Sequence, residues 1–168
     1  DFRHYFYQIR LPPGTRDAFR IKTQSKCFRL QVLPMGWSWS PFIGQGITIA
    51  LLAEAIERAG FSIVTEKDDK VPGKLEFRGK NKNKCRGFVI ALSDNVMIAT
   101  SETEDRSMIT KNLKKVLEEC NIEVKRDDPI ESGITSSTDG LSFLGLEFRK
   151  TEESGLKWRH NEEKKARW

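Results

Sequence analysis

The stretch FVIALSDNVMIA, Phe88 to Ala99, decides the fold. Two runs of apolar and β-branched residues flank the polar segment Ser93-Asp94-Asn95, and this pattern predicts a strand, a tight turn and a second strand. Asp and Asn favour turns for local reasons, so the turn alone requires no function. A carboxylate at the tip of a buried hairpin is nevertheless costly unless a cation meets it, which makes Asp94 a candidate ligand.

Length and charge limit the class of protein. With 168 residues, of which 38% are hydrophobic and 32% charged, the chain suits one soluble domain with a core. We find neither an apolar run long enough to cross a bilayer nor a signal-peptide pattern, so we expect no membrane partner. Three widely spaced cysteines form no metal-ligand cluster, and we expect an intracellular protein of the nucleus or cytoplasm rather than a secreted one. The net charge of +5 favours a polyanionic partner.

Helical periodicity is present on both sides of the hairpin. The first predicted helix carries an apolar stripe between residues 43 and 59, with Ser40 as its N-cap and Gly60 as its terminator. The second is expected to open with a capping box formed by Ser101 and Glu104 and to stop at Asn121.

The remaining apolar segments predict strands. We expect strands at residues 19–33, 122–124 and 141–148, and residues 156–158 are expected to pair with the last of these. Together with the first segment of the chain, the elements follow the order strand, helix, strand, strand, helix, strand. This order is that of the ferredoxin-like split βαβ plan, an α+β fold in which two helices back an antiparallel sheet.

The ferredoxin-like plan would bring two acidic residues together. Its first and third strands are antiparallel neighbours, so Asp1 at the end of the first strand would meet Asp94 at the turn that opens the third. Two adjacent carboxylates repel each other, and a divalent cation with phosphate oxygens would relieve that repulsion. Two-metal phosphoryl transfer uses such carboxylates to hold the attacking and leaving oxygens.

A basic tract, residues 66–86, interrupts the periodic pattern. It contains eight Lys or Arg residues against four acidic ones, and Pro72-Gly73 lies within it. We interpret it as a surface hairpin or loop inserted into the domain. Two interpretations of the tract stay open. It is either a solvated insertion without a binding role, or it contacts nucleic-acid phosphates through Arg78, Lys80, Lys82, Lys84 and Arg86.

Four segments, in order along the chain, resemble the palm of reverse transcriptases. Asp1, followed five residues later by the aromatic Phe6, resembles motif A, and LPMGWSWSPFIGQ, residues 33–45, resembles motif B. The turn at residues 92–95 stands where the family carries an aromatic-x-Asp-Asp turn, and residues 143–145 resemble the FLG segment that opens the primer-grip hairpin.

The resemblance implies a fold and an activity for the whole chain. Residues 1–168 would form an α+β, ferredoxin-like polymerase palm with an appended primer-grip-like hairpin at residues 141–158, and the fingers and thumb would lie outside this chain or on a partner polypeptide. The implied activity is that of a retroelement-type RNA-directed DNA polymerase, which adds deoxynucleotides to a primer 3′ end by two-metal nucleotidyl transfer. The implied partners are an RNA template, a DNA primer and deoxynucleotides.

The resemblance also assigns roles to individual residues. Asp1 and Asp94 would hold Mg²⁺ or Mn²⁺, with Asn95 beside them as the third member of the catalytic set. Phe6 would lie under the sugar and exclude a 2′-hydroxyl, with Tyr5 next to it. The residues that would line the nucleotide or position the primer are Pro34, Met35 and Gly36 for the nucleotide and Phe143, Leu144 and Gly145 for the primer grip. Core packing is the alternative role of Phe6, Trp37, Phe143 and Leu144.

Three residues depart from the family pattern in this presumed site. Asn95 replaces the second Asp of the turn and should lower metal affinity, Met35 replaces a glutamine, and Tyr5 replaces a small residue. The alternative hypothesis is therefore a domesticated, catalytically weak palm that acts as a scaffold in a ribonucleoprotein or protein complex. A plain ferredoxin-like RNA-binding module is a third hypothesis, but it gives no reason for a carboxylate at the hairpin tip.

Overall fold

The computed structural model describes residues 2–64, 73–79, 86–125, 140–143, 146–151 and 155–160. The chain divides into two units, Asp1–Lys125 and Arg126–Trp168, and each is described by itself. Among the described residues, no helix is both long enough and apolar enough to cross a membrane.

The first unit contains a four-stranded sheet in which each strand runs antiparallel to its neighbour. Its strands, in sheet order and in chain order, are β3 (Phe61–Val64), β4 (Lys74–Gly79), β5 (Arg86–Leu92) and β6 (Asn95–Thr100). The hairpin predicted from residues 88–99 is confirmed: Leu92 pairs with Asn95, and Ser93 in the turn between them has a positive φ of 54°.

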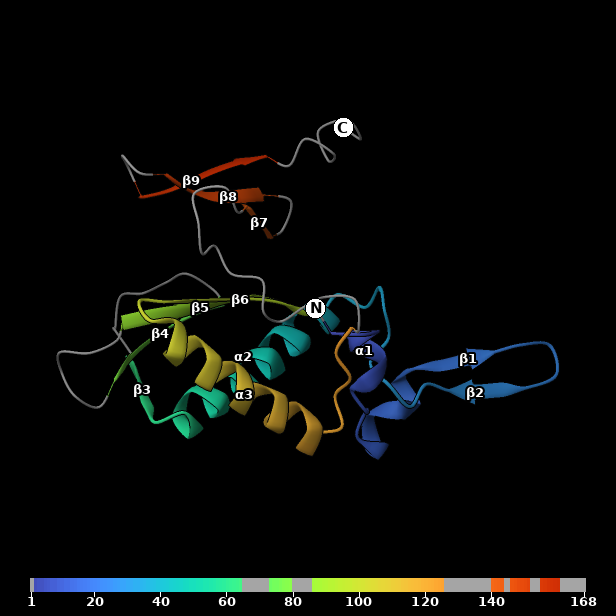
Figure 1. Cartoon of the computed structure of the whole chain (residues 1–168). Helices are drawn as coiled ribbons and strands as arrows, with labels where there is room; N and C mark the ends of the chain where they lie inside the picture. Colours follow the sequence, from blue (N-terminus) through green and yellow to red (C-terminus); the bar gives the residue numbers. More distant parts are fainter. Residues whose placement is uncertain are drawn as a thin grey trace. The chain divides into compact units, whose positions relative to one another are not determined.

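Both predicted helices are present, as α2 (Ser40–Arg58) and α3 (Thr103–Glu119), and they lie on the same side of the sheet (Figure 1). Each ends as predicted, because Gly60 and Asn121 take the left-handed conformation that lets the chain leave a helix. The predicted side-chain caps are wrong. The Ser40 hydroxyl bonds the Pro34 carbonyl instead of capping its own helix, and no side chain caps α3.

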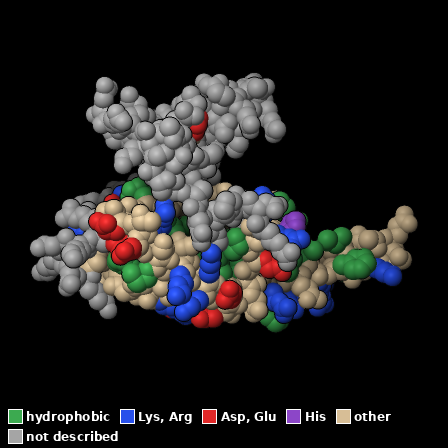
Figure 2. Space-filling model, in the orientation of Figure 1, with side chains coloured by type: hydrophobic (Ala, Val, Ile, Leu, Met, Phe, Trp, Pro, Cys, Tyr) green, Lys and Arg blue, Asp and Glu red, His purple; other side chains and the backbone are tan. Residues whose placement is uncertain are grey.

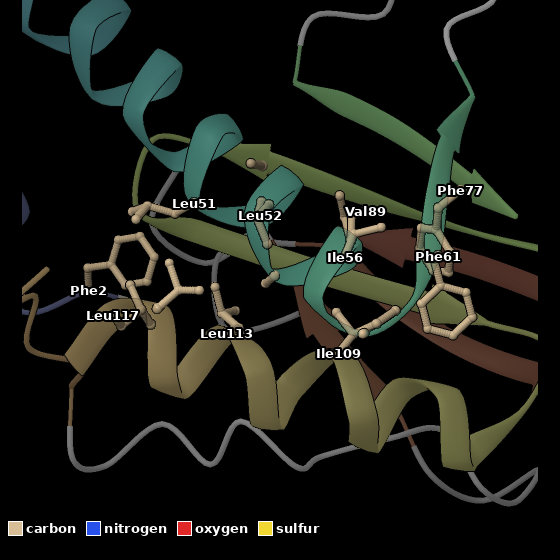
Figure 3. Packing of buried hydrophobic residues seen from close by; sticks show 14 of the residues in the cluster. Phe2, Leu51, Leu52, Ile56, Phe61, Phe77, Val89, Ile109, Leu113 and Leu117 are labelled. Atoms are coloured by element: carbon tan, nitrogen blue, oxygen red, sulfur yellow. The ribbon is translucent and has the colours of Figure 1, made fainter. Parts of the chain in front are cut away.

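The core of the first unit lies between these helices and the sheet (Figure 3). Alternation along the strands places every second residue on the helix side, where Val89 and Phe77 are 0% and 1% exposed. The helices meet them with fully buried side chains at Leu52, Ile56 and Ile109. Burial of this kind, rather than local propensity, supplies most of the stability of such helices.

The N-terminal segment differs from its prediction. It consists of α1 (Tyr5–Gln8), the 3₁₀ helix η1 (Pro13–Ala18), β1 (Arg20–Lys22) and β2 (Cys27–Arg29). The single half-buried strand predicted at residues 19–33 is wrong, because β1 and β2 pair with each other as a hairpin. Phe28, expected on a buried face, is 51% exposed.

The basic tract at residues 66–86 is not simply an insertion. Its middle is β4, which is hydrogen-bonded between β3 and β5 in the sheet. Phe77 within β4 belongs to the core, and this single buried aromatic explains why so charged a segment forms a strand. Residues 65–72 and 80–85 lie outside the described part of the chain.

The segment after α3 returns to the N-terminus. Phe2 and Val124 form an antiparallel bridge, and the Arg3 N–H donates to the Glu123 carbonyl at 3.0 Å. The Gln8 side chain bonds the backbone N–H of Glu123 at 2.6 Å and its carbonyl at 3.1 Å. The strand predicted at 122–124 is thus reduced to a bridge, and the general class of α+β with an antiparallel sheet and helices is confirmed.

The second unit is a three-stranded antiparallel meander of β7 (Gly140–Phe143), β8 (Leu146–Thr151) and β9 (Gly155–His160). The strand predicted at residues 141–148 is divided in two, because Phe143 of β7 pairs with Leu146 of β8. The predicted pairing of residues 156–158 with it is confirmed in the β8–β9 ladder. Leu144 and Gly145, predicted for a primer grip, lie outside the described residues.

Candidate active site

Asp94 lies in the turn between β5 and β6, where the protein leaves its side chain half-buried. The Nδ2 of the neighbouring Asn95 donates to Asp94 Oδ1 at 3.3 Å. A half-buried carboxylate on a two-residue turn is accessible to a ligand, and support from outside the strand ladder holds it in one orientation. The support comes from α2.

Gln45 on α2 holds both flanks of the Asp94 turn with one side chain. Its Oε1 accepts from the Ser93 N–H at 2.7 Å, and its Nε2 donates to the Ala91 carbonyl at 2.8 Å. An amide bonded at both ends cannot rotate without losing a bond, so it fixes the turn against the helix. We identify Gln45 as a residue that positions Asp94.

Gly73 completes this clamp from the start of β4. Its carbonyl accepts from the Ala91 N–H at 2.8 Å, and its φ is +86°. A Cβ at this position would come within 2.2 Å of the Ala91 oxygen and 2.6 Å of Gln45 Nε2. Only glycine therefore allows the backbone of residue 73 and the Gln45 amide to share the Ala91 peptide group.

Thr48, one turn further along α2, joins the Asp94 turn to the N-terminal segment. Its Oγ1 lies 2.5 Å from the Ser93 carbonyl and 2.8 Å from the Tyr5 hydroxyl, which in turn donates to the Gly44 carbonyl at 2.8 Å. The two hydroxyl protons can form only two of these three contacts as hydrogen bonds at one time. The network connects segments that are 43 and 45 residues apart in the sequence.

Burial and the charge of Asp94 both affect the Tyr5 phenol. Burial is the larger effect and raises its pKa above the ordinary value of 10.0, because the ring is 3% exposed and a phenolate there loses hydration. The hydrogen bond from Thr48 opposes this shift, and the negative charge of Asp94 adds to it. Tyr5 is therefore neutral at physiological pH and able to donate its proton.

The raised pKa of Tyr5 predicts a loss of stability in alkali. Below pH 10 Tyr5 is protonated in both the folded and the unfolded protein. Above pH 10 the unfolded chain releases this proton first, because the folded-state pKa is higher. The free energy of unfolding therefore falls as the pH rises through the folded-state pKa. Tyr7 is the other of the two tyrosines, so in Tyr7→Phe the tyrosinate absorbance reports Tyr5 alone. We expect this variant to titrate above pH 10 and the free energy of unfolding to fall over the same range; titration below pH 10 would contradict the burial of Tyr5.

The location of Tyr5 differs from the role predicted for it. Its ring lies in the core against Phe2, with ring centroids 5.1 Å apart, instead of lining an open nucleotide site. Gly44 makes room for it: a Cβ there would lie 3.1 Å from the Tyr5 ring and 3.0 Å from that of Phe6. Tyr5 therefore contributes to the network behind Asp94, whereas Phe6 is half-buried at the margin of the core.

The loop before α2 has a defined shape. The bond from Ser40 Oγ to the Pro34 carbonyl, at 2.6 Å, closes it, and Gly36 takes a φ of +87° that other residues rarely adopt. Met35 is 64% exposed at its tip, and its sulfur accepts from the Tyr7 hydroxyl at 3.4 Å. The residues predicted to line a nucleotide are thus held in one exposed loop.

Several predicted site residues are not described. Asp1 is one of them, so its separation from Asp94 stays a prediction, and so do the phosphate contacts of Lys80, Lys82 and Lys84. Arg86 and Phe143 are placed in β5 and β7 by their backbone only, whereas Arg78 is an exposed residue of β4.

Gln45 and Thr48 were not predicted, although the sequence contained a signal for one of them. Thr48 interrupts the apolar stripe of α2 at the spacing of Gly44, Leu51 and Ala55, and it is 0% exposed. A polar residue in a buried stripe requires a partner. Gln45 carried no such signal, because its partners lie 46 and 48 residues away.

Comparisons with known protein families, with curated proteins and with solved structures found no match. The chemistry of the site therefore has to be inferred from its donors. The carboxylate of Asp94 and the amide oxygen of Asn95 are hard oxygen donors of the type that Mg²⁺ prefers. The described residues contain no group of three or more His, Cys, Asp or Glu that could hold a metal, and Asp1 is not among them.

Proposed function

We propose that this chain is the palm of an RNA-directed DNA polymerase of the retroelement reverse-transcriptase type. The observation that carries the proposal is the convergence of three motif-like segments on one turn. The N-terminal segment reaches it through Tyr5, the helix after the LPMG loop through Gln45 and Thr48, and the turn itself presents Asp94. These are the segments whose order resembles motif A, motif B and the aromatic-x-Asp-Asp turn of the family.

The network around Asp94 supports catalysis better than it supports an ordinary turn. A turn needs no more than its own strand ladder, whereas a carboxylate that takes part in phosphoryl transfer has to be held within about half an ångström of its working position. Gln45 fixes both flanks of the turn, and Thr48 fixes the carbonyl of the residue before Asp94. This degree of positioning is the physical requirement for two-metal chemistry.

The proposal assigns the second carboxylate to Asp1. Asp1 directly precedes Phe2, whose ring packs on that of Tyr5, and the Tyr5 hydroxyl is close enough to Asp94 to sense its charge. Mg²⁺ or Mn²⁺, when bound, would supply the positive charge that activates the primer 3′-hydroxyl and stabilises the leaving pyrophosphate. The partners would be an RNA template, a DNA primer and deoxynucleotides, inside the cell.

The proposal is tested by extension of a labelled DNA primer on an RNA template. The full-length protein, with Mg²⁺ and deoxynucleotides, is expected to extend the primer, and chelation of the metal is expected to stop extension. An RNA-templated reaction that incorporates ribonucleotides equally well would contradict the role of Phe6. Absence of both extension and Mg²⁺-dependent nucleotide binding would overturn the polymerase.

One contact favours a second candidate function, that of a catalytically degenerate scaffold. The Asn95 amide takes the place of a second acid in the turn and donates to Asp94 Oδ1, so it lowers both the negative charge and the free lone pairs available to a metal. A scaffold would bind RNA without extending a primer. In that case Asn95→Asp is expected to create metal-dependent nucleotide binding that the wild-type protein lacks.

Replacing Gln45 tests whether the network positions Asp94. Gln45→Ala removes the bonds to Ser93 and Ala91, so we expect kcat for primer extension to fall about 10- to 100-fold, as for other supporting-shell residues. The KM for the deoxynucleotide should change little, because both ends of the Gln45 amide are used by the backbone of the turn. A purely structural role would instead lower stability and leave kcat of the folded enzyme intact.

The matched control for Gln45 is Gln31→Ala, since Gln31 is an exposed residue of the segment that follows β2. It makes the same chemical change without touching the Asp94 turn. Equal kinetic effects of the two substitutions would contradict the positioning role of Gln45.

A further inference from the structure

The β1–β2 hairpin carries a concentration of positive charge that the proposed active site does not use. Residues 16–29 contain five Lys or Arg residues and one acidic residue, in a chain whose net charge is +5. Every residue from Arg20 to Arg29 is exposed, and the hairpin projects from the body of the first unit (Figures 1 and 2). An exposed ribbon of this composition is a candidate binding surface.

The register of the hairpin separates its charged and apolar side chains. Arg20 is paired with Arg29, Lys22 with Cys27, and Ile21 with Phe28. Because paired residues lie on the same face and successive residues alternate, the arginines and Lys22 share one face. Ile21 and Phe28, which are 50% and 51% exposed, share the other. We call the first of these the cationic face.

The cationic face contains more charge than it can neutralise. Two arginines placed directly across a strand pair repel each other, and Asp17 relieves this by bonding both, at 3.0 Å to Arg20 and 2.9 Å to Arg29. One carboxylate thus serves two guanidinium groups, and Lys22 adds a further cation. The side chains of Asp17, Arg20 and Arg29 are each more than half exposed, so these ion pairs are weak and can exchange for other partners.

The hairpin has a fixed shape and a fixed root. At its tip, the backbone N–H and the hydroxyl of Thr23 both lie within hydrogen-bond distance of the Lys26 carbonyl. At its root, the Leu33 N–H donates to the Ile9 carbonyl at 2.8 Å, and the Phe19 ring contacts Trp37 edge-on at 4.8 Å. Leu33 leads directly into the loop that the proposed function assigns to the nucleotide, so the hairpin and that loop share one support.

We propose that the cationic face binds the phosphate backbone of a single-stranded nucleic acid. Guanidinium groups bind phosphate in a bidentate manner, and the cations recur every second residue along the strand, at about 6.6 Å, where a flexible backbone can follow them. Phe28 is exposed on the opposite face of the ribbon, so it takes no part in these phosphate contacts. Identification of this strand as the RNA template rests on the proposed function; the binding itself does not.

The test compares two triple variants that each remove three positive charges. Arg20→Gln, Lys22→Gln and Arg29→Gln neutralise the cationic face; Lys111→Gln, Lys114→Gln and Lys115→Gln do the same on exposed positions of α3. The affinity of the full protein for a labelled single-stranded RNA is measured by fluorescence anisotropy over a series of salt concentrations. Because each lost phosphate contact lowers the salt slope of a single strand by about 0.7, we expect the slope to fall by about 2 in the hairpin variant and to stay unchanged in the α3 variant.

Equal salt slopes in the hairpin variant, the α3 variant and the wild-type protein would overturn the inference. So would a slope that falls only with duplex RNA, since the proposal is for a single strand. If the wild-type protein extends no primer but the hairpin variant loses RNA binding, the inference holds and the polymerase proposal fails. If the wild-type protein extends the primer and the hairpin variant binds RNA with an unchanged salt slope, the polymerase proposal holds and the inference fails. The unfolding midpoint in urea controls for folding.

A protein partner is the competing occupant of the hairpin. Ile21→Thr with Phe28→Thr removes the apolar face and leaves the cations in place. If this pair alters the sedimentation of the protein while the cationic variant leaves RNA binding unchanged, the hairpin is a protein contact and the proposal is wrong.

Discussion

Asp94→Ala is expected to abolish primer extension, with a loss on the order of 10³-fold or more, as when a single catalytic group is removed elsewhere. The physical reason is that the carboxylate would hold the cation, and alanine leaves no oxygen in its place. The half-buried side chain is not part of the hydrophobic core, so the variant should remain folded. Extension is measured as the initial rate at saturating Mg²⁺, with the unfolding midpoint as a check.

Two substitutions control for the loss of negative charge. Asp94→Asn keeps the size of the side chain and an oxygen donor but removes the charge. Its rate of primer extension should therefore lie between that of Asp94→Ala and that of the wild-type protein. Glu118→Ala removes a negative charge from the exposed surface of α3 and is expected to leave the rate unchanged. Extension at the wild-type rate by Asp94→Ala would remove Asp94 from the site and, with it, the polymerase.

Elements with a strong hydrophobic period could be predicted, because a single face of each is buried. This is true of α2, α3 and the β5–β6 hairpin, whose apolar residues recur at the spacing of the element. β4 was missed because its sequence is dominated by charge, and Phe77 is its one fully buried residue, with Leu75 partly buried beside the core. One strand was predicted where β1 and β2 form a hairpin, because apolar and polar residues alternate there as they would in a half-buried strand. In the structure every residue of β1 and β2 is exposed, so this alternation does not mark a buried face.

The candidate site shows the same division between local and distant information. The position of Asp94 in a hairpin turn could be predicted, because a carboxylate between two apolar strands is visible within a dozen residues of sequence. The residues that hold it could not, since Gln45 and Thr48 reach the turn across 45 to 48 positions. The predicted N-cap of Ser40 failed for a related reason: the Pro34 carbonyl, six residues away, competes for the same hydroxyl.

Phe77→Ala is expected to lower the free energy of unfolding of the first unit by about 3–5 kcal/mol, the range for large aromatic residues removed from a core. The Phe77 ring is 1% exposed and packs on Phe61 with centroids 5.4 Å apart. It also occupies the place of a missing side chain: a Cβ on Gly87 would lie 2.3 Å from it. The residue of β5 directly opposite Phe77 therefore has no side chain to fill the cavity that alanine would leave, and the cost should lie near the top of the range.

The control for Phe77 is Phe42→Ala, because Phe42 is 70% exposed and contacts Trp39 only edge-on, at 5.7 Å. The chemical change is the same, but little buried surface is lost, so the expected cost is below about 1 kcal/mol. Urea unfolding followed by tryptophan fluorescence measures both. Similar values for the two variants would mean that β4 is not anchored in the core, and the sheet that carries Gly73 and the Asp94 turn would then lack the rigidity on which the proposed chemistry depends.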